Sequence, residues 1–192
     1  MRSVVFILSI VFTTLCWKSA QAAPSCFELF KAENFVNPES IKHPDRLQNM
    51  RGRALFVGEI DSVPVVIKPE PRPEEEAFFT ALLDRLHLGP KFFGVVRLSQ
   101  VKGLTGLIHP SERESFGIVT ELIPDAVFVK PGERTYTTRT WSKEQIEMIV
   151  AQAESAARIL GAQSVIIDDF QFMLTRDNRV LIIDPQLYEQ GH

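Results

Sequence analysis

Short runs of apolar, often β-branched residues predict strands at several places along the chain. They comprise residues 54–60, 63–68, 91–98 and 114–123, and two runs within residues 164–186. The first two runs are joined by the polar pair Asp61-Ser62, which is typical of a β-hairpin. The last two are joined by the polar segment 175–179, which predicts a second hairpin.

Residues 71–90 show the pattern of an amphipathic helix. Pro73 suits the first turn, and the three glutamates that follow it are favoured by the helix dipole. The pair Gly89-Pro90 predicts the end of the helix. One face carries apolar residues at helical spacing, at positions 79, 82, 83 and 86.

A second, longer helix is predicted within residues 140–163. Ser142 and Gln145 have the spacing of a capping box, and Gly161 is expected to end the helix. The expected apolar face comprises Ile146, Ile149, Val150, Ala153, Ala157 and Leu160. Residues 27–35 suggest a short helix, and the rest of the segment up to residue 50 suggests a loop. This order of elements predicts an α+β fold.

The N-terminus has the three-part layout of a secretory signal peptide. Arg2 is followed by an apolar run and then by the small-residue pattern Ala20-Gln21-Ala22, so cleavage is expected near Ala22. The run is shorter than the roughly 20 residues that span a bilayer, which argues against stable membrane insertion. We therefore expect a secreted or periplasmic protein with three parts: the signal peptide at 1–22, an extension at 23–50 and one domain at 51–192.

Charge and cysteine content limit the possible partners and covalent links further. The chain has 21 basic and 24 acidic residues, and loss of residues 1–22 would remove two of the basic ones. An acidic chain offers no electrostatic footprint for nucleic acid. Only Cys26 would remain after cleavage, so no internal disulfide is expected.

Lys68 is the first residue to suggest chemistry, because it closes the apolar strand VPVVIK. Glu74, Glu75 and Glu76 begin the next helix and could supply its anionic partner. A simpler interpretation stays open, in which Lys68 marks a solvated strand end and the glutamates only favour the helix start. In the same way, the pair Asp168-Asp169 could simply cap a turn.

Taken together, these segments resemble the protein-kinase-like fold from about Arg51 to Gln186. VPVVIK resembles the strand with the nucleotide-binding lysine, and EEEAFFTALLDRLHLGP resembles helix C. FGIVTELIPD resembles the strand that enters the hinge. FMLTRDNRVLIID is similar to the hairpin that follows the catalytic loop. The resemblance implies a kinase-like N-lobe, an antiparallel sheet plus helix C, with a truncated C-lobe made of one long helix and a catalytic-loop hairpin.

The resemblance also implies a site. Lys68, oriented by Glu76, would hold phosphate oxygens, and Gly52 would belong to the phosphate loop, for which Gly58 is the other candidate. Asp184 and Gln171 would bind Mg²⁺ with ATP, since hard oxygen ligands suit that ion. Asp168 or Asp169 would orient an acceptor hydroxyl.

The site departs from the family pattern in its spacing. The family places its catalytic aspartate five residues before the metal-binding amide, whereas Asp168 and Asp169 precede Gln171 by three and two residues. A glutamine replaces the family's asparagine, and Pro185-Gln186 follow the metal aspartate. The resemblance is therefore to a minimal or degenerate member, similar to compact kinase-like domains of exported bacterial proteins.

Two classes of function remain open. The first is a secreted domain that binds a nucleotide or another phosphorylated ligand with Mg²⁺, with phosphotransferase activity as an extension. The second is a catalytically inactive, pseudokinase-like module with a protein partner, or an effector delivered into another cell. The scarcity of ATP outside the cytoplasm weighs against catalysis more than against the fold.

Overall fold

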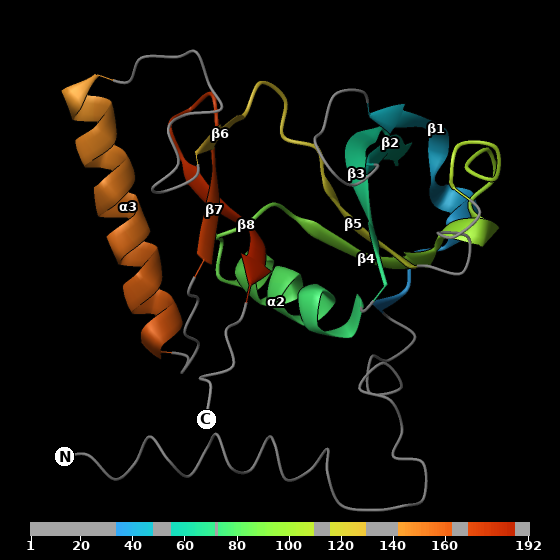
Figure 1. Ribbon diagram of the computed structural model, residues 1–192, viewed down its shortest axis with the longest axis horizontal. Helices are drawn as coiled ribbons and strands as arrows, with labels where there is room; N and C mark the ends of the chain where they lie inside the picture. The colour runs from blue at the N-terminus through green and yellow to red at the C-terminus, as the bar shows by residue number, and fades with distance from the viewer. Residues whose placement is uncertain are drawn as a thin grey trace, which may run out of the picture.

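The computed structural model describes residues 34–47, 55–71, 73–109, 116–129, 142–162 and 169–186, with backbone alone at 128–129, 169–170 and 184–186. The predicted signal peptide, Cys26 and most of the short helix predicted at 27–35 lie outside the described residues. Two antiparallel sheets and two long helices make up the described fold (Figure 1). This arrangement confirms the α+β class.

The elements follow one another in the order that Figure 1 labels. They are η2 (Pro38–Ser40), β1 (Lys42–Leu47), β2 (Leu55–Ile60), β3 (Val63–Glu70), α2 (Pro73–Arg85), β4 (Phe92–Arg97), η3 (Leu98–Gln100), β5 (Phe116–Glu121), β6 (Val127–Val129), α3 (Lys143–Ala162), β7 (Asp169–Leu174) and β8 (Val180–Gln186).

The larger sheet has the strand order β1-β2-β3-β5-β4, and all its pairs are antiparallel. The predicted hairpin is confirmed as β2 and β3. Asp61 and Ser62 have φ angles of 50° and 65°, so both turn residues adopt the left-handed conformation. Positive φ at both positions is the requirement of the tight turn that matches strand twist.

The two faces of the larger sheet are covered differently. Val65 and Ile67 are fully buried, and they belong to the main apolar cluster together with Ile41, residues of β2 and the segment after β4. Because side chains alternate along a strand, Lys68 lies on the opposite face from Ile67. On that face a smaller cluster forms from Ala77 of α2, Val95 and Ile118.

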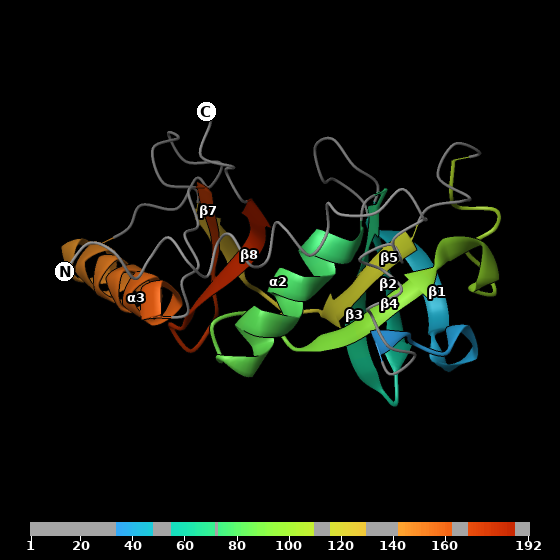
Figure 2. The same cartoon turned by 90° about the horizontal axis from the view of Figure 1, so that it is seen from below.

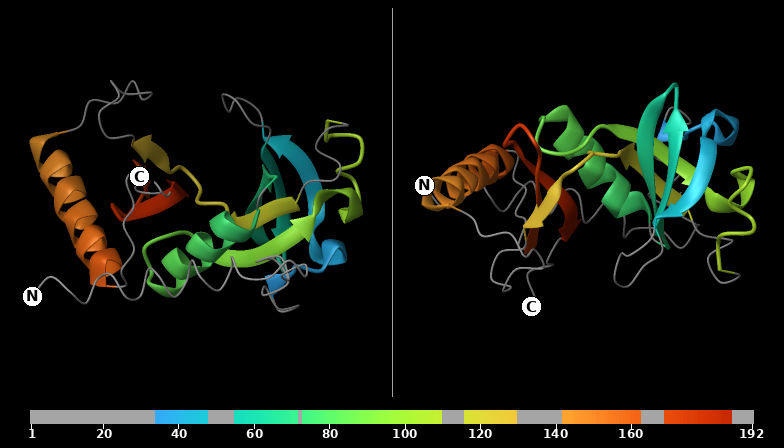
Figure 3. Two further views of the ribbon diagram at one scale, coloured as in Figure 1. Left: turned by 60° about the horizontal axis from the view of Figure 1, so that its bottom comes forward. Right: turned by 90° about the horizontal axis from the view of Figure 1, so that it is seen from above.

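The smaller sheet has the order β6-β7-β8, and β7 and β8 form the predicted second hairpin. Helix α3 lies beside this hairpin (Figure 3). An apolar cluster joins the hairpin to both helices; it comprises Leu83, Ala156, Leu160, Phe172 and Ile182. The hairpin is therefore held between α2 and α3.

Helix α2 is the element that connects the two sheets. Figure 2 shows it between the five-stranded sheet and the β7–β8 hairpin. Its end has two backbone bonds, from Leu88 N to Leu83 O at 2.8 Å and from His87 N to Asp84 O at 2.8 Å. These are the two bonds of a Schellman motif, with His87 in its left-handed position at φ 58°. Leu88 O then accepts a hydrogen bond from Ile182 N of β8 at 2.7 Å.

Three local predictions differ from the structure. Residues 42–47 form the edge strand β1 and not a loop; they pair with β2 through a register irregularity between Lys42 and Asp45. Helix α2 ends at Arg85 and is followed by the left-handed residue His87, before the predicted stop at Gly89-Pro90. Helix α3 continues through Gly161 to Ala162.

The apolar face predicted for α3 is partly wrong. Ile149 and Leu160 are buried as predicted, but Ile146 and Val150 are 50% and 49% exposed. The buried face includes Ala156, which packs with Leu160 in the cluster that contains Phe172 and Ile182 of the hairpin. Helix periodicity alone does not distinguish neighbouring faces when apolar residues cover much of the helix surface.

The start of α3 follows the prediction closely. Ser142 Oγ accepts a hydrogen bond from Gln145 N at 3.2 Å, and Gln145 Oε1 accepts one from Ser142 N at 3.0 Å. This reciprocal pair is a capping box. Within the part of the chain that the structure describes, no helix has the length and apolar character needed to cross a membrane.

Candidate functional site

Lys68 lies on the face of β3 that α2 covers. Its cross-strand neighbour is Ile118 of β5, and residues directly opposite in an antiparallel pair share a face. Ile118 packs against Ala77, which follows Glu76 in the helix. The pleat of the sheet and the packing of α2 therefore bring the Lys68 side chain to the first turns of the helix.

Lys68 and Glu76 form a close ion pair. Lys68 Nζ donates to Glu76 Oε1 at 2.7 Å, and their side chains are 21% and 15% exposed. Partial burial lowers the local dielectric and so strengthens the attraction relative to an exposed pair. The residue pattern left Glu74, Glu75 and Glu76 open as partners and the family resemblance selected Glu76, which is the residue that makes the contact.

The β7–β8 hairpin places Gln171 close to Asp184 along the backbone. Gln171 is paired with Ile183, the residue before Asp184, and Asp169 is paired with Gln186. The register shifts between these two pairs, so Asp184 lies at a bulge. Bulges redirect side chains and are frequent beside functional sites.

The other predicted site residues have different locations. Gly52 and Asp168 lie outside the described residues, and of Asp169 and Asp184 the structure describes the backbone. Gly58 lies within β2, where a Cβ atom would come 3.0 Å from Lys42 O of β1. Gly58 is thus packed against β1 within the sheet, and its membership of a phosphate loop stays a prediction.

The predicted site has two parts, the Lys68–Glu76 pair and the β7–β8 hairpin, and helix α2 contacts both. The helix carries Glu76 near its start, and near its end Leu83 packs with Phe172 and Ile182 of the hairpin. Ile182 lies two residues before Asp184. A shift of α2 would therefore act on the Lys68 pair and on the hairpin together.

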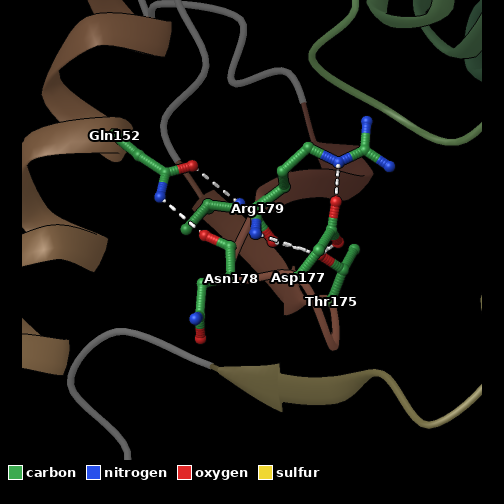
Figure 4. Close-up of polar contacts among 6 residues, drawn as sticks. Gln152, Thr175, Asp177, Asn178 and Arg179 are labelled. Atoms are coloured by element: carbon green, nitrogen blue, oxygen red, sulfur yellow. Dashed lines mark hydrogen bonds and ion pairs between the residues drawn. The ribbon is translucent and has the colours of Figure 1, made fainter.

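The turn of the β7–β8 hairpin carries a polar network, drawn in Figure 4. The buried Thr175 hydroxyl donates to Asp177 and accepts from Arg179 N at 2.9 Å, and Arg179 Nε donates to Asp177 Oδ2 at 2.9 Å. The Thr175 hydrogen bond is the main cause that lowers the pKa of Asp177 from its ordinary value, and the Arg179 charge adds to it. Asp177 therefore serves the turn, as its position in the sequence predicted.

Gln152 of α3 joins this network and was missed by sequence reasoning. Its Oε1 accepts from Val180 N at 2.9 Å, and its Nε2 donates to Asn178 O at 2.8 Å (Figure 4). The available signal was its position: it lies three residues after buried Ile149 and four before buried Ala156. A polar residue at that spacing faces a packed surface and needs a partner there.

The side-chain types of the predicted site limit the ligands that it could bind. Among the residues that the structure describes, no group of three or more His, Cys, Asp or Glu side chains is placed to hold a metal ion. Carboxylate and amide oxygens, as in Asp184 and Gln171, suit a hard cation such as Mg²⁺. A lysine held by a carboxylate suits an anionic group such as phosphate.

No protein-family model matches the chain, and no curated protein matches it.

Proposed function

We propose that the protein is a secreted, kinase-like domain that binds a nucleotide or another phosphorylated ligand together with Mg²⁺. The Lys68–Glu76 ion pair carries this proposal. It joins a central strand of an antiparallel sheet to the helix packed on that sheet, with the two side chains 21% and 15% exposed. The simpler interpretation was that Lys68 marks a solvated strand end. Such a lysine would be largely exposed, and the 21% exposure of Lys68 does not favour it.

The pair is suited to anion binding. Lys68 Nζ donates to Glu76 Oε1, and a lysine ammonium group is a cation that binds phosphate oxygens through charge-assisted hydrogen bonds. The carboxylate also limits the rotamers of the long lysine side chain, which lowers the entropy lost when a ligand binds. Lys68 would therefore offer a fixed positive charge to phosphate oxygens.

The metal part of the proposal rests on Gln171 and Asp184. Their side-chain oxygens fit the preference of Mg²⁺ for hard ligands, and the hairpin register keeps their backbones close. Bound Mg²⁺ would neutralise phosphate charge on an ATP-like ligand. The residues of the chain would hold and orient that ligand.

A non-catalytic binding module is the second candidate, and the position of Asp169 favours it. Asp169 is paired with Gln186 within β7, so its backbone belongs to the sheet and not to a loop before it. Phosphate transfer needs a carboxylate that reaches the acceptor hydroxyl beside the phosphate. The interval of two residues between Asp169 and Gln171 leaves little chain for such a loop.

A thermal-shift screen of ATP, GTP and ADP, with and without Mg²⁺, tests the proposal. A bound ligand raises the melting temperature by mass action, so at least one nucleotide should stabilise the protein when Mg²⁺ is present. Lys68→Ala and Asp184→Ala should abolish the shift, whereas Lys102→Ala, at an exposed lysine, should keep it. Equal shifts in all three variants, or none in the wild type, would reject the proposal. Release of ADP or labelled phosphate transfer would separate an enzyme from a binding module.

A further inference from the structure

The outer edge of β8 is anchored at two points. β8 is an edge strand of the β6-β7-β8 sheet, so alternate backbone N–H groups point away from β7. Val180 N donates to Gln152 Oε1 of α3 at 2.9 Å, and Ile182 N donates to Leu88 O after α2 at 2.7 Å. Gln152 of α3 and Leu88 after α2 thus accept the hydrogen bonds that a further strand would accept from β8.

The Gln152 side chain makes the two hydrogen bonds that a residue of a neighbouring strand would make. Its side-chain amide both accepts from Val180 N and donates to Asn178 O, as a paired backbone amide would (Figure 4). The hydrogen bonds among Thr175, Asp177 and Arg179 hold the turn together internally, but they do not connect it to a helix. Gln152 supplies that connection, because it belongs to α3.

Asp184 lies on the same strand as these anchors. It is two residues beyond Ile182 and four beyond Val180, or about 7 and 13 Å along an extended chain. The register shift begins immediately after the Gln171–Ile183 pair. Before the bulge, β8 is held at Val180 and Ile182. These two anchors determine where the strand enters the bulge.

We infer that Gln152 is a positioning residue: by fixing the start of β8 against α3, it sets the location of Asp184 and Gln171 for Mg²⁺. This inference rests on the proposed function. Gln152 acts through the hairpin and contacts neither the metal nor the nucleotide. Outer groups that orient metal ligands typically change metal affinity by 10-fold to 100-fold when they are removed.

Gln152→Leu removes both hydrogen bonds at nearly constant volume, and Gln152→Glu keeps only the acceptor for Val180 N. The matched control is Ser142→Ala, which weakens the α3 capping box without touching the hairpin. Mg²⁺ would be titrated at a fixed ATP concentration, well below the melting temperature of each variant. The Mg²⁺ concentration for half-maximal binding should rise about 10-fold in Gln152→Leu, less in Gln152→Glu, and not in Ser142→Ala.

A purely structural role would leave this Mg²⁺ midpoint equal in Gln152→Leu and Ser142→Ala, and that result would overturn the inference. ATP affinity without Mg²⁺, which depends on Lys68, should be the same in all variants.

Amide hydrogen exchange provides a test that needs no ligand. The Asp184 amide should exchange faster in Gln152→Leu than in Ser142→Ala, and equal rates would overturn the inference. If the wild type binds no nucleotide, the proposed function fails, and the exchange rates alone then decide whether Gln152 positions Asp184.

Discussion

Lys68 of β3 and Glu76 of α2 form an ion pair across 2.7 Å, with both side chains largely removed from water. The same helix contacts the β7–β8 hairpin through Leu83 and, beyond its end, through Leu88. Helix α2 therefore links the five-stranded sheet to the hairpin that carries Gln171 and Asp184, and the ion pair is one of its contacts with the sheet.

A double-mutant cycle should show strong coupling between Lys68 and Glu76. Lys68→Met and Glu76→Leu should each lower the free energy of unfolding by about 1.5–3 kcal/mol, because each leaves a partly buried charge without this partner. The double variant should lose less than the sum of the two, with a coupling of about 1 kcal/mol or more. Urea denaturation measures all three values.

The chain offers a control for that cycle. Lys143 and Glu147 of α3 form an i,i+4 pair at 3.7 Å with side chains 85% and 66% exposed. Their coupling should stay below about 0.5 kcal/mol. Similar coupling energies in both cycles would contradict the importance given to burial of the Lys68 pair.

The end of α2 offers a stabilising substitution at His87. The residue has φ 58° in the Schellman motif, a conformation in which a Cβ atom is unfavourable. His87→Gly should raise the free energy of unfolding by about 0.5–1 kcal/mol, measured by urea or thermal denaturation. His87→Ala keeps the Cβ atom and should give no such gain. A gain of the same size in both variants would assign the effect to loss of the imidazole.

The free energy of unfolding should depend on pH through Asp177 in the hairpin turn. The hydrogen bond from Thr175 lowers the folded-state pKa of Asp177 below its ordinary value of 3.8. Since a depressed folded pKa favours the folded state when the group is ionised, the contribution is fully present above the unfolded pKa. It is lost as the pH falls through the folded pKa.

An NMR titration of the Asp177 carboxyl group tests this origin. The midpoint in the wild type should lie below 3.8, and Thr175→Val should move it upward because the donor is removed. Equal midpoints in the wild type and in Thr175→Val would show that the hydroxyl does not set the pKa.

Local sequence patterns predicted the elements whose signals lie within a few residues. The Asp61-Ser62 turn, the Ser142–Gln145 capping box and the 175–179 turn were all expected and all are present. Each depends on contacts between residues near in sequence, so pattern and structure agree. The pairing of Lys68 with Glu76 was also expected, although there it was the family resemblance that selected the partner.

Elements that depend on distant contacts were harder to predict. β1 contains Pro44 and mostly polar residues, and it is a strand because β2 offers it an open edge. The role of Gln152 depends on a turn 26 residues away, so the sequence around it contains only a weak signal. The buried face of α3 was misjudged for the same reason, since the hairpin decides which side is covered.

The most direct test of the central claim exchanges the two charges, as Lys68→Glu combined with Glu76→Lys. The exchanged pair should recover part of the unfolding free energy that either single reversal loses, because an attraction is restored between the same positions. Binding of Mg²⁺-ATP, measured by isothermal titration calorimetry, should remain abolished, because the cation no longer stands on β3. Equal ATP affinity in the wild type and in the exchanged variant, or no binding in the wild type, would contradict a phosphate-binding role for Lys68.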